Sequence, residues 1–298
     1  MNPQFFQPLW DLFGIKGWNA YATIEWITFL LAVPITYLVT RYIKIDIKKM
    51  YINQVWMFYT GILGSKLFHI IFDEKLAEYI SLIETRGFLV FLEQEFLYPW
   101  KGGQVFYGGI LTGLAGGTLL GYFLYRGRDR WLYIVRTYDI VVFTFYMMSA
   151  VGRVGCFLQG CCYGAISDTF GMVFPGRSAA AGGLFRQGLI ESRFVETPPL
   201  IPTQLIETFT SGSIFLFLMF RLRKADQLWT GYFAWHALMF HAIARFCIEF
   251  LRIDRRGGLW IFSTSQWIAI TVATILIIIR IRMLRANRPL VKGGVQGV

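Results

Sequence analysis

The chain is poor in histidine and in acidic residues. Among its 298 residues are three histidines and 18 acidic residues against 29 basic ones, and the formal net charge is +11. His69, His236 and His241 are not spaced like zinc ligands, so a histidine-based metal centre is not expected. An excess of basic residues can indicate nucleic-acid binding, but here these residues lie in short clusters between apolar runs, which is the pattern of membrane topology. We therefore expect no nucleic-acid partner.

The sequence also lacks the marks of a cleaved leader and of a repeat architecture. Its N-terminus has neither a Lys/Arg-led signal region nor a small-residue cleavage pattern, so we expect it to be retained. It contains no internal repeat and no low-complexity segment. We expect one membrane domain over residues 1–288, followed by a flexible, basic, glycine-rich tail at 289–298.

Apolar residues, by contrast, are abundant. Hydrophobic residues make up 55% of the chain, aromatic residues 18%, and the mean hydropathy is +0.50. A soluble protein of this length could not bury so much apolar surface, so we predict an all-α integral membrane protein. Seven apolar runs are long enough to cross a bilayer, at about 21–41, 53–72, 104–125, 131–152, 204–220, 229–250 and 261–281.

The connections between these runs predict an orientation. Basic residues follow the first, third, fifth and seventh runs, whereas the segment 73–100 is rich in acids. The positive-inside rule then places the N-terminus outside, the C-terminus in the cytoplasm, and the long connections 73–103 and 153–203 outside. Arg252, Arg255 and Arg256 break the rule, which indicates either a miscounted span or arginines kept outside for a ligand; we favour the ligand.

The stretch MMSAVGRVGCFLQGCCYG at 147–164 has the features of a site. Arg153 stands at the end of an apolar run, and a charge facing lipid at the centre of a membrane costs about 2.5–3.5 kcal/mol unless a partner or substrate compensates it. The glycines that follow, ending with Gly164, let the backbone turn and approach a ligand closely.

Three of the four cysteines, Cys156, Cys161 and Cys162, follow Arg153. Their C-x4-C-C spacing, with a distant Cys247, does not match common zinc motifs, so we expect no metal and no cofactor. Three interpretations stay open: a disulfide on an oxidising face, buried free thiols that pack as small apolar residues, and a nucleophilic thiolate near Arg153.

A second charged motif, RFCIEFLRID at 245–254, lies in the sixth run. Arg245, Glu249 and Arg252 are spaced i, i+4 and i+7, which places them on one helix face. Three charges in an apolar segment predict a polar cavity. Together with Arg153 they supply three guanidiniums, which bind phosphate in a bidentate way. We therefore expect an outward-open cavity for a phosphate-bearing lipid.

Other polar residues in apolar runs have two interpretations each. Asp139 is either a structural polar contact or a catalytic acid, and it is too far along its helix to pair with Arg153 directly. Gln204 and Glu207, three residues apart, mark either a helix start or a ligand contact.

The glycine-rich start of the third run also has two interpretations. Tyr107, between Phe106 and Gly108, is either a headgroup ligand or an interfacial anchor. Three small residues repeat every four positions, a spacing that predicts close helix packing: Gly109, Gly113 and Gly117.

These motifs, in this order, resemble the prolipoprotein diacylglyceryl transferases, seven-span enzymes of the bacterial inner membrane. The likeness rests on Tyr21, GGQVFYGG, Asp139, GRVGCFLQGCCYG, PTQLIE and RFCIEFLR. It implies transfer of an sn-1,2-diacylglyceryl group from phosphatidylglycerol to the lipobox cysteine of a preprolipoprotein, with release of glycerol phosphate. It also implies a periplasm-facing site that uses no cofactor.

The resemblance implies residue roles as well. Arg153 and Arg245 would hold the donor phosphate and stabilise the leaving group, while Tyr107 and Glu249 would serve proton transfer or orientation. The expected substrate contacts are Tyr21, Gly108, Gly109, Asp139, Cys156, Cys161, Gly164, Gln204, Glu207 and Arg252.

The chain departs from the family pattern at several polar positions. Tyr107 and Ile201 replace histidines, Cys156 and Gln159 replace asparagines, and Cys161 replaces a glutamate. These departures leave three alternatives open: a paralogue with another acceptor, a non-catalytic phospholipid-binding or transport protein, and a thiol–disulfide membrane enzyme.

Overall fold

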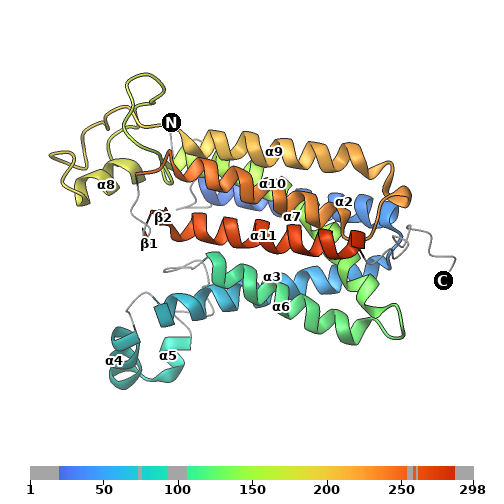
Figure 1. Ribbon diagram of the computed structural model, residues 1–298. Coiled ribbons are helices and arrows are strands. Elements are labelled where there is room, and N and C mark those ends of the chain that lie inside the picture. The colour runs from blue at the N-terminus through green and yellow to red at the C-terminus, as the bar shows by residue number, and fades with distance from the viewer. Residues whose placement is uncertain (1–19, 73–75, 93–105, 254–257, 260, 286–298) are drawn as a thin grey trace, which may run out of the picture. The chain divides into compact units, whose positions relative to one another are not determined.

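The computed structural model describes residues 20–72, 76–92, 106–253, 258–259 and 261–285, and it is mainly helical (Figure 1). Its contacts divide the chain into two compact units. Unit 1 comprises Met1–Ile43 and Tyr138–Val298, and unit 2 comprises Lys44–Thr137. Each unit is described separately below.

Unit 2 is built on two helices packed along each other, α3 (Ile47–Phe72) and α6 (Phe106–Leu124). It also holds α4 (Leu76–Arg86), α5 (Phe88–Leu92) and the first turns of α7 (Arg130–Gln159).

Glycines on α6 allow the close approach of α3. A Cβ on Gly113 would lie 3.1 Å from the Met57 carbonyl oxygen, and one on Gly117 would lie 2.5 Å from the Met57 Cγ. A Cβ on Gly109 would likewise lie 3.1 Å from the Gly61 carbonyl oxygen. The packing interpretation of the four-residue glycine repeat is therefore confirmed.

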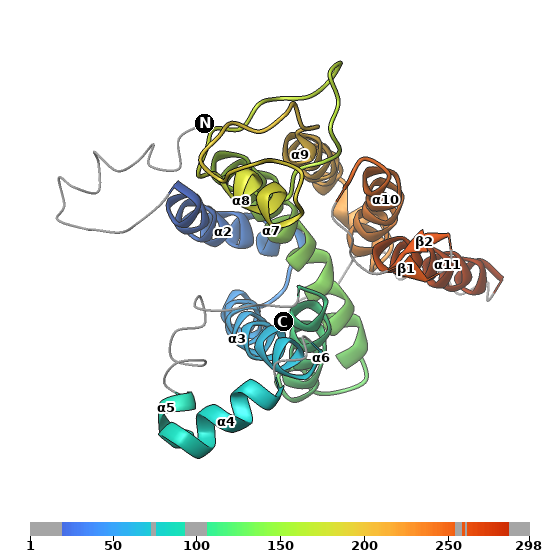
Figure 2. The same cartoon turned by 90° about the vertical axis from the view of Figure 1, so that its left-hand side faces the viewer.

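Unit 1 contains the other long helices. They are α2 (Ala20–Ile43), the remainder of α7, α9 (Thr203–Leu222), α10 (Tyr232–Glu249) and α11 (Thr264–Arg285). Short elements connect them: α8 (Ala179–Arg186), η2 (Ala225–Gln227) and the paired strands β1 (Gly258–Leu259) and β2 (Phe262–Ser263). Figures 1 and 2 show the segment that contains α8 gathered at one end of these long helices.

Four helices of the described residues are long and apolar enough to cross a membrane: α2, α7, α9 and α11. Large apolar side chains stand exposed on them, among them Leu30 at 71% and both Phe209 and Phe220 at 77%. Such surfaces suit contact with lipid rather than water. The predicted class, an all-α membrane protein, is confirmed at this level. All seven predicted apolar runs also overlap helices.

Helix α7 is longer than the predicted run at 131–152, because it continues to Gln159. The charge of Arg153 marked the end of the apolar run, but arginine is a good helix former, and the helix continues past it while its side chain pairs with Glu207. Arg153 and Cys156 consequently lie inside the helix rather than in the connection after it.

The connection that follows α7 is a folded segment rather than an open loop. Tyr163, Phe174, Leu184 and Leu200 are buried in one cluster, and Leu200 forms backbone bridges with two neighbouring segments. Ser178 caps α8 by accepting a hydrogen bond from the Ala181 amide at 3.2 Å. This packing gives the end of α7 a fixed framework.

The α3–α6 contact yields a first prediction. Gly113→Val should lower the free energy of unfolding by about 1–3 kcal/mol, because the new side chain has to displace the Met57 backbone. The measurement is thermal denaturation in detergent. Leu111→Val, at a position on the same helix that is 58% exposed, is the matched control. Equal melting temperatures for the two variants would contradict the packing argument.

Candidate functional site

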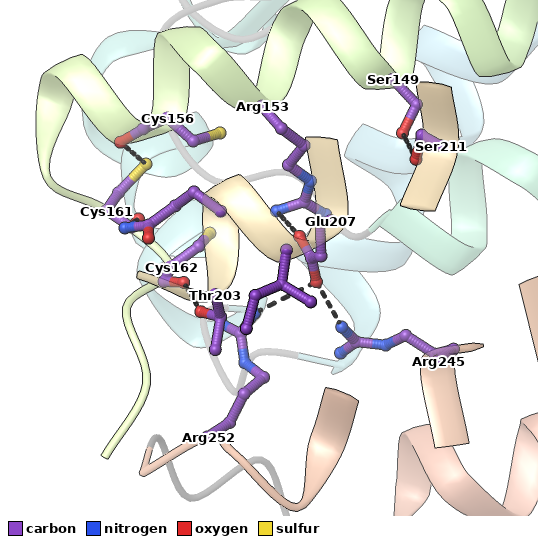
Figure 3. Close-up of polar contacts among 12 residues, drawn as sticks. Ser149, Arg153, Cys156, Cys161, Cys162, Thr203, Glu207, Ser211, Arg245 and Arg252 are labelled. Carbon is purple, nitrogen blue, oxygen red and sulfur yellow. Dashed lines mark hydrogen bonds and ion pairs between the residues drawn. The ribbon is translucent and has the colours of Figure 1, made fainter. Parts of the chain in front are cut away.

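Three arginines from different parts of unit 1 meet the carboxylate of Glu207 (Figure 3). Arg153 Nη1, from α7, lies 2.7 Å from Glu207 Oε2, and Arg245 Nη1, from α10, lies 2.8 Å from Glu207 Oε1. Arg252, just after α10, approaches Glu207 Oε1 at 3.6 Å. The Glu207 and Arg252 side chains are only 8% and 2% exposed. We call these four residues and Glu249 the arginine cluster.

Glu249 completes the cluster. It pairs with Arg245 one helical turn earlier, with Glu249 Oε2 at 2.7 Å from Arg245 Nη2. Arg245 and Glu249 thus pair along α10, as their spacing predicted. Arg252 does not share that helix face, because α10 ends at Glu249. Three positive charges against two negative ones leave the cluster with one net positive charge. A buried excess of positive charge is stabilised by an anion, and each guanidinium carries five donors for one.

Small residues set the register that brings Arg153 to Glu207. Ser149 lies four residues before Arg153 on α7, and Ser211 lies four residues after Glu207 on α9. Their hydroxyl groups are 3.1 Å apart (Figure 3). Two side chains this small allow the antiparallel helices to approach closely, so that the longer charged pair meets one turn further on.

The three cysteines converge at the end of α7, because the helix ends in a Schellman motif. Gly160 has a φ of 76°, its amide bonds to the Phe157 carbonyl oxygen at 3.1 Å, and the Cys161 amide bonds to the Cys156 carbonyl oxygen at 3.0 Å. Cys162 then takes a φ of 58°, an uncommon backbone conformation for a residue other than glycine. This turn folds the chain back over Cys156.

The sulfur atoms of Cys156, Cys161 and Cys162 all lie within 4.8 Å of one another. All four cysteines are free thiols, and Cys247 is exposed. Hydrogen bonds from Cys156 and Cys161 lower the pKa of the Cys162 thiol, and the charges of Arg153 and Arg252 act in the same direction against the effect of burial. We call the three the thiol cluster.

The first turn of α9 holds the thiol cluster in place. The Thr203 hydroxyl donates to the Cys162 carbonyl oxygen at 2.6 Å, and Gln204 Nε2 donates to the Cys161 carbonyl oxygen (Figure 3). Gln204 Oε1 is buried without a hydrogen-bond partner among the described residues. Gln204 therefore supports the backbone of the cysteine turn and carries one acceptor atom for a further group.

Gly164 joins the cysteine turn to two other segments. Its amide donates to the Ile201 carbonyl oxygen at 2.8 Å, the next amide donates to the Leu251 carbonyl oxygen at 2.8 Å, and Gly164 forms a bridge with Arg252. A Cβ at position 164 would lie 2.5 Å from the Leu251 carbonyl oxygen. The backbone passes here through a gap that only glycine fits.

Helix α2 adds Tyr21 and one residue that the sequence analysis missed, Glu25. Tyr21 packs against Gly155, is hydrogen-bonded to Glu25, and interacts electrostatically with Cys156. Glu25 Oε1 lies 3.3 Å from the position that a Cβ on Gly152 would take. The available signal was an acid inside the first apolar run, which normally marks a functional or paired group.

Asp139 has a well-defined structural environment. Its two carboxylate oxygens accept the backbone amides of Gly231 and Ala234 at 2.6 and 2.8 Å, at the start of α10. A carboxylate in this position caps the helix and complements its dipole. The contacts favour the structural alternative for Asp139 over a substrate contact.

Some predicted site residues belong to unit 2, and others fall outside the described residues. Tyr107, Gly108 and Gly109 belong to the first turn of α6 in unit 2, where Gly108 packs against Phe68. Arg255 and Arg256 fall in a stretch outside the described residues.

Comparison with known sequences identifies the family of the chain. The family model for prolipoprotein diacylglyceryl transferase matches residues 10–282. The chain belongs to the prolipoprotein diacylglyceryl transferase family.

Relatives in this family carry matching names. The Clostridium perfringens phosphatidylglycerol–prolipoprotein diacylglyceryl transferase 2 is 31% identical over 214 residues, which cover 72% of this chain and 70% of that protein. The Clostridium tetani phosphatidylglycerol–prolipoprotein diacylglyceryl transferase is 29% identical over 70% of this chain and 71% of its own. The Wolbachia pipientis relative of the same name is 26% identical over 86% of this chain and 88% of its own.

The confined backbone at Gly164 yields a second prediction. Gly164→Ala should lower the free energy of unfolding by about 1–3 kcal/mol, because the added methyl group overlaps the Leu251 carbonyl oxygen. Gly182→Ala, where a Cβ meets nothing within 4 Å, is the control and should leave the melting temperature unchanged or slightly higher. If both substitutions behave alike in thermal denaturation, the Gly164 backbone is not confined as described.

Proposed function

We propose that this protein transfers an sn-1,2-diacylglyceryl group from phosphatidylglycerol to the lipobox cysteine thiol of preprolipoproteins. The cysteine sulfur attacks the sn-3 carbon of the diacylglyceryl group and forms a thioether. The bond from that carbon to the phosphate oxygen breaks, and its electron pair leaves with glycerol phosphate. The thiol proton passes to a base or to water, so the reaction needs no other reactant.

The arginine cluster is the observation that carries this proposal. Its net positive charge and its three guanidinium groups suit the phosphodiester of the donor lipid. They suit the leaving phosphate better, because that group gains negative charge in the reaction. Arg153 and Arg245 would clamp the phosphate, with Arg252 as a third cation. Glu207 would hold the three guanidiniums together in the absence of lipid, because its carboxylate offsets their mutual repulsion.

The remaining predicted residues take supporting roles in this proposal. Tyr107 and Glu249 serve proton transfer or orientation. We had expected Gly108 and Gly164 to make room for lipid, but the space beside them is taken by Phe68 and by the Leu251 carbonyl, so we assign them to packing. The substrate partners are phosphatidylglycerol, the lipobox segment and the surrounding membrane lipids.

The topology belongs to the proposal as well. Seven spans place the N-terminus outside and the C-terminus in the cytoplasm of the bacterial inner membrane, following the basic connections. The arginine and thiol clusters then open to the periplasm at the end where the 160–202 segment gathers. Substituted-cysteine labelling from each side of the membrane tests this orientation.

A reconstituted reaction tests the activity directly. Purified protein in micelles that contain phosphatidylglycerol should add a diacylglyceryl mass to a lipobox-cysteine peptide and release an equal amount of glycerol phosphate. A peptide with serine in place of the cysteine is the control. Glycerol phosphate released equally without peptide would indicate another acceptor, and no turnover beside an active family enzyme would favour a lipid-binding protein.

The arginines give a further prediction. Arg153→Ala and Arg245→Ala should each lower the transfer rate by about 100-fold or more, as expected for the loss of a donor to a developing charge. The lysine variants keep the charge but lose the bidentate geometry, so they should fall between the alanine variants and the parent protein. Arg193→Ala, at an exposed position beside Phe194, should retain activity. Full transfer by both alanine variants would overturn the assignment.

A further inference from the structure

The proposed binding of the donor phosphate by Arg153 and Arg245 leaves the thiol cluster without a role. Cys156, Cys161 and Cys162 come from one helix end and its turn, yet their sulfur atoms meet within 4.8 Å. The Schellman motif and the positive φ of Cys162 produce this convergence, and Thr203 and Gln204 fix the carbonyl groups of the turn. An uncommon backbone conformation maintained by its surroundings is often found at a functional site.

The spacing of the sulfurs fits a metal ion. Three thiolates around tetrahedral zinc, with Zn–S bonds of about 2.3 Å, have their sulfurs about 3.8 Å apart. The separations of up to 4.8 Å approach this value and require only small side-chain movements. Soft sulfur ligands favour zinc over the hard cations that prefer oxygen, and zinc needs no redox partner.

The charge of the neighbouring residues also suits a zinc ion held by three thiolates. Three thiolates and one divalent zinc ion carry one net negative charge. Positive charges lie close by in the chain, because Arg153 is on α7 with Cys156 and Arg252 forms a backbone bridge with Gly164, two residues after Cys162. Arg153 and Cys156 are three residues apart on one face of α7, so the thiol and arginine clusters are neighbours. A sulfur nucleophile at the thiol cluster would therefore lie beside a phosphate held by the arginines.

We propose that Cys156, Cys161 and Cys162 bind one zinc ion through three thiolates, and that the fourth coordination position takes the sulfur of the acceptor cysteine. The role in transfer rests on the function proposed above. The acceptor thiol releases its proton to solvent on coordination, because metal-bound thiols are deprotonated. Its sulfur then attacks the sn-3 carbon, and glycerol phosphate leaves with the electron pair. The resulting thioether is a weaker ligand and dissociates from the zinc.

The first experiment measures metal content without any turnover. Full-length protein, produced with zinc and purified under reducing conditions without a metal-affinity step, should hold about one zinc per chain by mass spectrometry. Cys156→Ser, Cys161→Ser and Cys162→Ser should each lose most of it. Cys247→Ser, which removes an exposed thiol outside the cluster, should retain it. Substoichiometric zinc in the parent protein, or retention by the three variants, overturns the site.

A second experiment controls for misfolding of the serine variants. Chelator should remove zinc from the parent protein, expose three further reactive thiols, and lower the melting temperature, and added zinc should reverse all three changes. A disulfide between two of the three cysteines, found by peptide mass mapping of metal-free protein, overturns the proposal in favour of a redox role.

The open coordination position has its own test. Cobalt-loaded protein should show thiolate-to-cobalt absorption that changes when a lipobox-cysteine peptide is added and stays constant with the serine peptide. No change with either peptide overturns acceptor binding at the metal.

Transfer that persists at full rate in zinc-free protein overturns only the role of the zinc ion in transfer. Stoichiometric zinc in a protein without transfer activity overturns the proposed function while the metal site stands.

Discussion

The ion pairs of Glu207 are the constraint on which the site depends. One carboxylate on α9 receives guanidinium groups from α7, from α10 and from the segment after α10. Removing the Glu207 carboxylate would leave its buried guanidiniums uncompensated, and the loss of one partner from a buried pair costs about 3–5 kcal/mol. The helices therefore have to meet at this point, and the Ser149–Ser211 contact one turn away permits it.

The sequence predicted the helical class and the charged residues of the site because both have strong local signals. Apolar runs locate helices, and a charge inside a run has to find a partner. The i, i+4 spacing of Arg245 and Glu249 predicted their contact along one helix face, and they form an ion pair there. Arg252 was expected on the same face, but α10 ends at Glu249 and Arg252 reaches Glu207 from the segment after it. The sequence could not predict that Glu207 is the shared partner, because residue 207 is distant from Arg153 in the chain and pairs with it only through the α7–α9 register.

The thiol cluster shows a second limit of sequence analysis. The C-x4-C-C spacing matches no common metal motif, yet a helix end with Gly160 and Cys162 at positive φ brings three sulfurs together. Spacing rules assume a regular backbone between ligands, and a left-handed turn breaks that assumption. Asp139 illustrates the reverse case, because this conspicuous acid in an apolar run caps the start of α10. Whether an intramembrane acid serves structure or chemistry is decided by its partners.

The bonds around Gly164 have an evolutionary consequence. The cysteine turn is joined to residues 201 and 251 by main-chain amides and carbonyls, and these groups are present whatever side chains the neighbouring positions carry. Substitutions at the turn can therefore alter its chemistry while its geometry persists. Side chains at positions 156 and 161 could then change in evolution while the bonds that hold the turn stay in place.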